Sequence, residues 1–479
     1  HRKFQGVCNH HDLGPLGAAI NVSALRHQLT LLKDMGCDAI RTAHNMPAPE
    51  LVRLCDEMGF MMMIEPFDEW DIAKCENGYH RYFNEWAEKD MVNMLRQYRN
   101  NPCVVMWSIG NEVPTQCSSE GYKVAKFLQD ICHREDPTRP VTCGMDQVSC
   151  VLDNGFAAML DIPGFNYRAH RYEEAYQRLP QNLVLGSETS STVSSRGVYK
   201  FPAERKADAK YEDHQSSSYD LEYCSWSNIP DIDFALADDY QWTLGQFVWT
   251  GFDYLGEPSP YDTDAWPNHS SMFGIIDLAS LPKDRYYLYR SVWNKQAETL
   301  HILPHWNWEG REGKEVPVFV YTNYPTAELF INGKSYGKQT KNNQSVENRQ
   351  NTNHLMTIMG GFEIMNEMQE MIQVPEFNKV WLEHARDYKQ KSLEITRNRF
   401  RVCRLMAYAA SHLYDPKTAA EAWKDLWSKL EHTPAPEFKI EKVLPPEVPA
   451  AMDECKTIST NDAALWSLDA IYMQEVIPQ

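Results

Sequence analysis

The chain has 479 residues, of which 43% are hydrophobic and 24% are charged, a composition typical of a folded globular protein with roughly two to four domains. Its formal net charge of −19 argues against nucleic acid as a partner, because such a surface repels phosphate backbones. No apolar run is long enough to span a bilayer, so we expect no membrane-spanning segment. A neutral substrate suits this charge better than an anionic one.

The twelve cysteines are scattered and form no paired C-x-x-C motif. We therefore expect mostly free, buried thiols and no zinc site. The first residue is His1 and no targeting segment is visible, which leaves the cellular compartment open.

Residues 1–300 alternate short apolar runs with amphipathic stretches. Helices are predicted at 22–35, 50–58, 83–98 and 122–134 from the spacing of apolar residues. Eight strands are predicted, at 4–8, 39–43, 60–67, 104–109, 140–144, 161–167, 183–188 and 245–252. Strands that alternate with helices in this number and order indicate an α/β fold, a closed (β/α)8 TIM barrel whose active site lies at the carboxyl ends of the strands.

The pattern changes after residue 300. Residues 301–349 alternate apolar and polar side chains around an Asn332-Gly333 turn, which is typical of a β-hairpin in a partial, immunoglobulin-like sandwich. Glycine is absent after Gly361, and apolar stripes at helical spacing follow, so residues 350–479 are predicted to be an all-α segment with a proline-rich break at 433–449. Its tryptophan-rich helices have a fold-level similarity to (α/α) toroids of polysaccharide-degrading enzymes.

Two glutamates stand at the ends of predicted strands. Glu112 follows the fourth strand in "MWSIGNEVP", and Glu188 ends the seventh in "VLGSETSS". A buried carboxylate is costly unless it is paired or used. Two carboxylates that face each other across a barrel mouth can carry out glycoside hydrolysis, in which one acts as an acid and the other attacks the anomeric carbon.

At these residues the sequence resembles glycoside hydrolase family 2, and in particular its β-galactosidases, over residues 3–345. The motifs "GVCNHHDLG", "AIRTAHNMPAPE", "WSIGNEVP", "VLGSETSS" and "FVWTGFDYLGEP" occur in the order found in that family. The resemblance implies that Glu112 is the acid/base and Glu188 the nucleophile. It also implies that Asn111 binds the sugar 2-hydroxyl and that Tyr167 orients the nucleophile.

Further positions that match the family are expected to shape the sugar pocket: His10, Asp12, Arg41, His44 and Trp249. Arg41 is also expected to act on the nucleophile by its charge. Structural alternatives remain for several of these residues and for the two glutamates. Glu112 and Glu188 could be buried structural carboxylates paired with Arg41. The two histidines could be ordinary loop residues, Trp249 could be barrel core, and Asp12 could cap a turn.

Two departures from the family bear on metal and substrate. Some relatives bind magnesium through a glutamate and a histidine two residues later, but here Phe67 stands two residues after Glu65, so we expect no metal. Glu65 is expected to hydrogen-bond an arginine or the neighbourhood of the acid/base instead. Relatives that act on glucuronides carry an Asn-x-Lys pair, which "DLASLPKDRYY" lacks. A neutral galactoside is therefore favoured, although Lys283 and Arg285 keep a uronide possible.

The expected function is that of a retaining, exo-acting β-galactosidase that acts on an oligosaccharide or polysaccharide and needs no organic cofactor. The alternatives are a β-glucuronidase or β-mannosidase on the same barrel, or a carbohydrate-binding remnant without turnover. Neither nucleic acid nor a membrane is an expected partner, and the oligomeric state is not predicted. The family resemblance favours a periplasmic or secreted protein.

Overall fold

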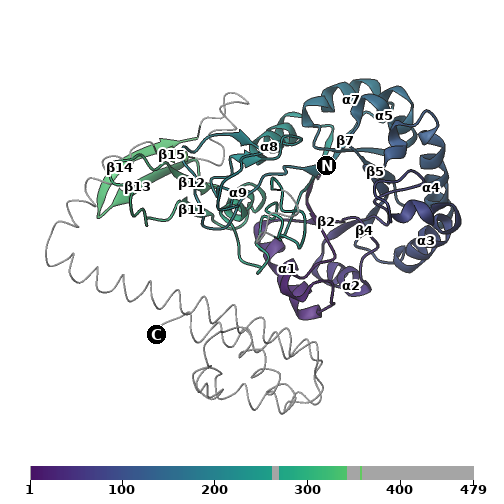
Figure 1. Cartoon of the computed structure of the whole chain (residues 1–479), viewed down its shortest axis with the longest axis horizontal. Helices are drawn as coiled ribbons and strands as arrows, with labels where there is room; N and C mark the ends of the chain where they lie inside the picture. Colours follow the sequence, from purple (N-terminus) through teal and green to yellow (C-terminus); the bar gives the residue numbers. More distant parts are fainter. Residues whose placement is uncertain (1, 262–268, 342–355, 359–479) are drawn as a thin grey trace, which may run out of the picture. The chain divides into compact units, whose positions relative to one another are not determined.

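The computed structural model describes residues 2–261, 269–341 and 356–358. Its centre is a closed barrel of eight parallel strands in the order β1-β10-β7-β6-β5-β4-β3-β2 (Figure 1). The strands are β1 (Phe4–Asn9), β2 (Ala39–Thr42), β3 (Met61–Ile64), β4 (Val104–Asn111), β5 (Val141–Met145), β6 (Ile162–Asn166), β7 (Val184–Thr189) and β10 (Thr243–Val248). The predicted TIM barrel is therefore confirmed.

Helices follow most barrel strands and lie outside the ring, as Figure 1 shows for α1 to α5 and α7. They are α1 (Val22–Met35), α2 (Pro49–Met58), α3 (Phe83–Tyr98), α4 (Gly121–Glu135), α5 (Val148–Asp153), α6 (Phe156–Met159), α7 (Tyr172–Arg178), α8 (Pro230–Asp239) and α9 (Asp284–Trp293). The spacing of apolar residues explains their position. In α1 the residues Leu25, Leu29, Leu32 and Met35 are all buried, so one stripe faces the strands.

The segment between strand β7 and helix α8 is mostly irregular. There the chain forms only the two-residue strands β8 (Lys206–Ala207) and β9 (Glu222–Tyr223), which pair with each other in parallel. This long connection places Trp226 at the barrel mouth, among the residues that line its cavity. Sequence periodicity gave no signal for it, because two-residue strands are too short to show a repeat and the rest of the segment is irregular.

Beyond the barrel, two small antiparallel sheets occupy the range predicted as a partial sandwich. One contains β11 (Leu300–Leu303), β12 (Val318–Thr322) and β15 (Met356–Ile358), and the other is the hairpin of β13 (Thr326–Ile331) and β14 (Lys334–Thr340). The hairpin turns at Asn332 and Gly333, both with positive φ, as a two-residue turn of this kind requires.

One correction concerns the range predicted to be helical. Residues 356–358 form β15, which pairs with β12 in antiparallel register from Val318↔Ile358 to Val320↔Met356. A three-residue strand is too short to produce a periodic signal, and its pairing depends on β12, nearly forty positions away in the sequence. The remainder of the predicted helical segment 350–479, including the break at 433–449, lies outside the described residues.

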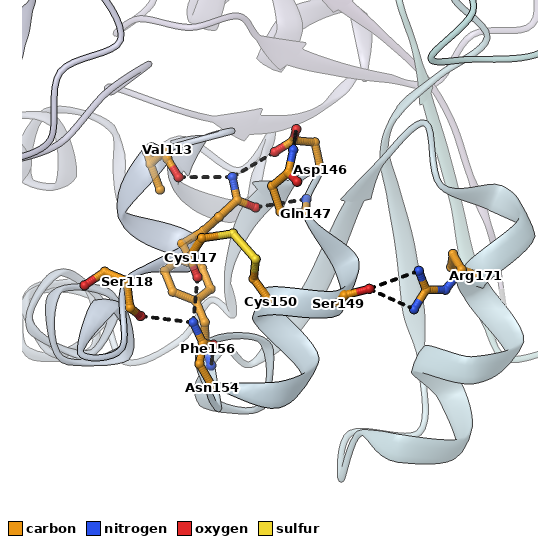
Figure 2. Close-up of a disulfide and its surroundings, with 11 residues drawn as sticks. Val113, Cys117, Ser118, Asp146, Gln147, Ser149, Cys150, Asn154, Phe156 and Arg171 are labelled. Carbon is orange, nitrogen blue, oxygen red and sulfur yellow. Dashed lines mark hydrogen bonds between the residues drawn. A yellow bond between two sulfur atoms is a disulfide. The ribbon is translucent and has the colours of Figure 1, made fainter.

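A disulfide joins Cys117 to Cys150, an exception to the expectation that the thiols are mostly free and buried (Figure 2). It connects the 3-10 helix η3 (Pro114–Cys117), which follows β4, to α5, which follows β5. The other cysteines among the described residues are free, and all of them except Cys75 are buried. No helix in the described ranges has the length and apolar character needed to cross a bilayer.

Candidate active site

A cavity of about 400 Å³ opens at the carboxyl ends of the barrel strands. It is lined by His10, His44, Asp68, Lys74, Asn111, Glu112, Asp146, Tyr167, Arg168, Glu188, Trp226, Trp249 and Glu257. Both predicted catalytic glutamates are in this set, together with most of the predicted sugar-binding residues. The structure thus brings together side chains from strands that are far apart in the sequence.

Glu188 lies on β7, and both of its carboxylate oxygens are hydrogen-bonded. Arg41 Nη1 donates to Oε1 at 2.6 Å, and the Tyr167 hydroxyl donates to Oε2 at 2.5 Å. Nε2 of His44 lies 3.6 Å from Oε1. These contacts fix the orientation of the carboxylate in a site where only 3% of the residue is exposed.

Glu112 follows β4 directly and is held differently. It has a positive φ of 44°, a conformation that ordinary residues seldom adopt and that clusters at functional sites. Its Oε1 accepts a hydrogen bond of 3.0 Å from Asn166 Nδ2. Burial raises the pKa of Glu112 to about 7, and the negative charges of Glu188 and Asp146 add to this effect. Glu112 can therefore carry a proton near neutral pH.

Asn166 and Tyr167, which are consecutive residues at the end of β6, connect the two glutamates. Asn166 donates to Glu112, while Tyr167 donates to Glu188. Asn166 Oδ1 also accepts a hydrogen bond of 2.7 Å from Ser187 Oγ on β7. Sequence reasoning identified Tyr167 but missed Asn166, because an asparagine inside a buried strand resembles any other polar residue until its neighbours are known.

A buried ion-pair network supports the site from below. Arg41 is fully buried and donates to Glu65 at 2.8 Å and 3.0 Å, and to Asn111 Oδ1 at 2.9 Å. Burial opposes ionisation of Glu65, but the charge of Arg41 and hydrogen bonds from His44 and Ser108 lower its pKa to about 2. The expectation that Glu65 hydrogen-bonds an arginine is confirmed.

Space for this network depends on a glycine in β5. A Cβ atom at Gly144 would lie 2.9 Å from Asn111 Oδ1, 3.0 Å from Arg41 Nη2 and 3.0 Å from Asn166 Oδ1. Any side chain at this position would therefore displace the polar groups that orient the two glutamates.

An aromatic wall stands on the side of the cavity formed by β1, β2 and β10. The rings of His44 and Trp249 stack at 5.4 Å with an interplanar angle of 5°, and the ring of His10 lies edge-on to Trp249 at 5.1 Å. Burial and the proximity of His44 lower the pKa of His10 to about 4, so His10 is neutral near pH 7. Its Nε2 is buried and has no hydrogen-bond partner among the described residues.

Several polar residues of the cavity were not predicted. Lys74 Nζ lies 2.9 Å from Asp68 Oδ1 and donates to the backbone oxygen of Asn111 at 2.8 Å. Asp68 in turn accepts a hydrogen bond of 3.1 Å from Asn111 Nδ2. Glu257 has a φ of 45° and accepts a hydrogen bond from the Tyr254 hydroxyl. These residues lie on long loops, where no periodic pattern marks their direction.

Two predicted sugar-binding residues do not line the cavity. Asp12 accepts hydrogen bonds from the backbone N–H groups of Gly14 at 2.6 Å and Leu255 at 2.8 Å, so it fixes loops, as its structural alternative stated. Arg41 is sealed beneath Glu188 and acts on the carboxylates, not on a ligand in the cavity.

Lys283 and Arg285, the two cations that kept a uronide substrate possible, do not lie in the cavity. Lys283 is buried, pairs with Asp253 at 2.7 Å and donates to the backbone oxygen of Ser194. Arg285 is buried as well and donates to the backbone oxygens of Phe273 and Gly274, both at 2.9 Å. Both cations hold backbone segments together, and neither lines the cavity.

The position that would complete a magnesium site does not fit a metal. Phe67 is buried and its ring stacks on Tyr79 at 4.9 Å, so it offers neither a ligand atom nor room for one. Glu65, the other candidate ligand, is occupied by Arg41 and His44. Among the described residues, no group of three His, Cys, Asp or Glu side chains is placed to hold a metal ion.

Comparison with known proteins agrees with this geometry. Residues 2–295 match the family model described as the TIM barrel domain of glycosyl hydrolases family 2. Residues 322–479 match a second one, the PcRGLX-like protein C-terminal alpha/alpha toroid domain, the class of domain to which the sequence analysis compared this range.

Individual relatives point to the same family. The chain is 40% identical over 379 residues to the β-galactosidase BoGH2A of Bacteroides ovatus, a match that covers 71% of this chain and 44% of that protein. It is 31% identical over 362 residues to a putative β-glucuronidase of Formosa agariphila, covering 70% of this chain and 33% of that protein. A crystal structure of a β-glycosidase from Bacteroides vulgatus matches with a TM-score of 0.64 and 34% identity, covering 75% of this chain and 46% of that one. The chain thus spans less than half the length of these relatives, and by its barrel it belongs to glycoside hydrolase family 2.

Proposed function

We propose that this barrel is the catalytic domain of a retaining β-glycosidase that removes terminal β-galactosyl residues. The observation that carries the proposal is the pair of glutamates in one cavity, of which Glu112 has a pKa of about 7 and Glu188 is bound by two donors. Hydrolysis with retention requires one protonated and one ionised carboxyl group, and these environments supply that difference.

In the first step, Glu188 attacks the anomeric carbon while Glu112 gives its proton to the glycosidic oxygen. The carbon–oxygen bond breaks, the leaving group departs as an alcohol, and a glycosyl ester forms on Glu188. In the second step, Glu112 removes a proton from water, and the water oxygen attacks the anomeric carbon. The ester bond breaks, so Glu188 returns as a carboxylate and Glu112 is protonated again.

The charge of the cavity favours a neutral sugar. Carboxyl groups from five residues line it, namely Asp68, Glu112, Asp146, Glu188 and Glu257. The lining residues include two cations, Lys74 and Arg168, and Lys74 is already paired with Asp68. A carboxylate on the terminal sugar would be repelled by this surplus of negative charge. The similarity to a protein described as a β-galactosidase supports the same choice.

A β-glucuronidase is the second candidate. Lys74 favours it, because this cavity-lining cation contacts Asn111 and could pair with the carboxylate of a glucuronide. Similarity to proteins described as β-glucuronidases in Formosa agariphila and Bacteroides fragilis also favours it. If Lys74 exchanged Asp68 for a substrate carboxylate, the net charge of the cavity would still be negative, which makes this candidate the weaker one.

A panel of nitrophenyl β-glycosides tests the assignment. Wild-type protein should hydrolyse the galactoside with a kcat/KM at least about ten-fold above the glucuronide and mannoside, a ratio worth about 1.4 kcal/mol. Glu188→Gln, purified in parallel, is the control for contaminating activity. Preference for the glucuronide would select the second candidate. Absence of turnover on every glycoside, with sugar binding retained, would select a carbohydrate-binding remnant.

We also propose that the protein works in an oxidising compartment, the periplasm or the cell exterior. The Cys117–Cys150 bridge supports this location, because disulfides persist in such compartments and are rare in the cytosol. Fractionation of the source cells, with the bridge assayed by thiol alkylation, would test it. Protein found in the cytosol with both thiols reduced would contradict it.

A further inference from the structure

The cavity has two walls that face each other across the barrel. In the strand order β1-β10-β7-β6-β5-β4-β3-β2, strands β5 and β6 lie opposite β1 and β2. His10 and His44 come from the ends of β1 and β2. Asp146 and Arg168 come from the ends of β5 and β6, and Trp226 comes from the connection after β9.

The contacts of the two glutamates differ. Glu188 contacts both walls, since Tyr167 at the end of β6 donates to it, whereas the hydrogen bonds of Glu112 among the described residues go to β5 and β6. Glu188 lies 3.6 Å from His44 and is bound by Arg41, which comes from β2. Glu112, by contrast, accepts a hydrogen bond from Asn166 on β6 and is influenced by the charge of Asp146 beyond β5. Since the nucleophile meets the sugar ring and the acid meets the leaving oxygen, the wall with Asp146, Arg168 and Trp226 is the leaving-group side.

Trp226 is unusual on this wall because it is a large aromatic residue that is 41% exposed. An indole that lines a cavity and faces solvent offers a flat apolar surface suited to the C–H face of a sugar ring. Arg168 Nη1 donates a hydrogen bond of 2.9 Å to the backbone oxygen of Trp226, which ties the two residues together. The segment that carries the indole is thereby anchored to β6.

Arg168 retains binding capacity. Its guanidinium has five N–H donors, and its one hydrogen bond to the described residues is the one to Trp226. No carboxylate in the described ranges lies within ion-pair distance of it, although the protein carries a net charge of −19. In comparison, Arg171, three residues later, pairs with Glu174.

We propose that Trp226 and Arg168 form a leaving-group subsite for an acidic sugar, the ring stacking on Trp226 and the carboxylate pairing with Arg168. The natural substrate is then a neutral β-galactosyl residue linked to a hexuronic acid. Asp146 shares this wall and disfavours an anion next to Glu112, so Arg168 is the favourable position for the carboxylate. The inference rests on the proposed function for the identity of the terminal sugar, but not for the binding of the acidic one.

Kinetics with three substrates tests the subsite. They are a β-galactosyl disaccharide that ends in a hexuronic acid, its counterpart that ends in the neutral hexose, and β-galactosyl fluoride, which has no leaving-group ring. Arg168→Gln should lower kcat/KM on the acidic disaccharide about ten-fold or more beyond its effect on the neutral one, which reports the loss of the Trp226 anchor, and it should change the fluoride less than about two-fold. Trp226→Ala should lower kcat/KM on both disaccharides but not on the fluoride, and Trp226→Phe should restore most of the loss.

Arg171→Gln is the matched control, because this arginine lies three residues later, at the end of the 3-10 helix Ala169–Arg171, and does not line the cavity. Equal kcat/KM for the acidic and neutral disaccharides in wild type, or equal losses in Arg168→Gln and Arg171→Gln, would overturn the subsite. A loss confined to nitrophenyl glucuronide in Arg168→Gln would assign the arginine to the terminal sugar and overturn it as well.

Failure of the proposed function is recognised separately. If wild type does not hydrolyse galactosyl fluoride, the galactosidase assignment fails. The subsite can still be tested by binding: the acidic disaccharide is titrated calorimetrically into wild type, Arg168→Gln and Arg171→Gln. Binding that falls about ten-fold in Arg168→Gln alone supports it. Binding that is absent or unchanged contradicts it.

Discussion

Arg41 Nη1 lies 2.6 Å from Glu188 Oε1, although the arginine is completely buried and cannot be reached from the cavity. The guanidinium spans Glu188 and Glu65 at once, which a lysine cannot do because it is a point charge on a flexible chain. Arg41 is therefore a positioning residue, and it holds the nucleophile from behind.

We expect Arg41→Lys to lower kcat about 100-fold, because a small displacement of a reacting group has an effect of that size. The free energy of unfolding should fall by about 3 kcal/mol, since one of two buried carboxylates loses its partner. Urea denaturation measures the second effect, and steady-state kinetics measures the first. A stable variant with unchanged kcat would show that Arg41 does not orient Glu188.

The nucleophile assignment predicts covalent labelling of Glu188. A 2-deoxy-2-fluoro-galactosyl inactivator with a reactive leaving group should leave one sugar on this residue, because the fluorine slows both steps and the leaving group speeds only formation of the ester. Peptide mass mapping locates the label, and Glu188→Gln should remain unlabelled. A label on Glu112, Glu257 or any other carboxylate would contradict the assignment.

The pH dependence of activity should reveal the pKa of Glu112, the proposed general acid. Because burial and then the charges of Glu188 and Asp146 raise the pKa of Glu112 to about 7, the protonated form predominates below that pH and is lost above it. We expect kcat/KM to fall on the alkaline side with a midpoint near 7. Asp146→Asn removes one of the negative charges, so its midpoint should move to lower pH.

Glu112→Ala provides the control for this interpretation. It should lose activity on substrates with poor leaving groups and retain the first step for dinitrophenyl glycosides, whose leaving group needs no proton. Its alkaline midpoint near 7 should be absent. An unchanged midpoint in both variants would show that another group causes the alkaline limb.

The barrel could be predicted from the sequence because its signals are local. Apolar periodicity in Val22–Met35 and Phe83–Tyr98 predicted both helices with the bounds that the structure has, and the ordered motifs placed Glu112 and Glu188 at strand ends. The polar environment of the glutamates could not be predicted in the same way. Asn166 bridges strands β4, β6 and β7, and its role depends on barrel closure, a property that no single segment carries.

The roles of the loop residues could not be predicted from the sequence. Asp12 and Trp226 both lie outside regular elements, but the first binds backbone N–H groups and the second lines the cavity. Their sequence neighbourhoods do not separate these roles, because side-chain direction in a loop is set by tertiary contacts. β15 was missed for a related reason, since its pairing with β12 is a long-range contact.

Chelators should leave activity unchanged. The ring of Phe67 fills the place where some relatives carry a histidine ligand, and Glu65 is bound by Arg41. Activity after dialysis against EDTA, with and without added Mg²⁺, measures this. A large loss that Mg²⁺ restores would require a site built from other residues. Phe67→His is a useful second variant, because activation of this variant by Mg²⁺ would show that the phenylalanine alone prevents metal binding.

The last prediction concerns the disulfide between Cys117 and Cys150, which joins the segments that follow β4 and β5 (Figure 2). These segments continue directly from Glu112 and Asp146, and Gln116 connects them further, since its Nε2 donates to Asp146 Oδ1 at 2.8 Å. The bridge closes a loop between residues 33 positions apart, so its removal should lower the free energy of unfolding by about 3 kcal/mol.

Urea denaturation of the double variant Cys117→Ser/Cys150→Ser measures this loss. Reductant should destabilise wild type to the same extent and leave the double variant unchanged. Cys75→Ser is the matched control, because Cys75 is free and exposed and its replacement should cost almost nothing.

If Gln116 alone holds Asp146 in place, the double variant will keep the alkaline midpoint of wild type. If the bridge is needed as well, the midpoint will move to lower pH, as in Asp146→Asn. Equal stability of wild type with and without reductant would show that the bridge contributes nothing to the fold.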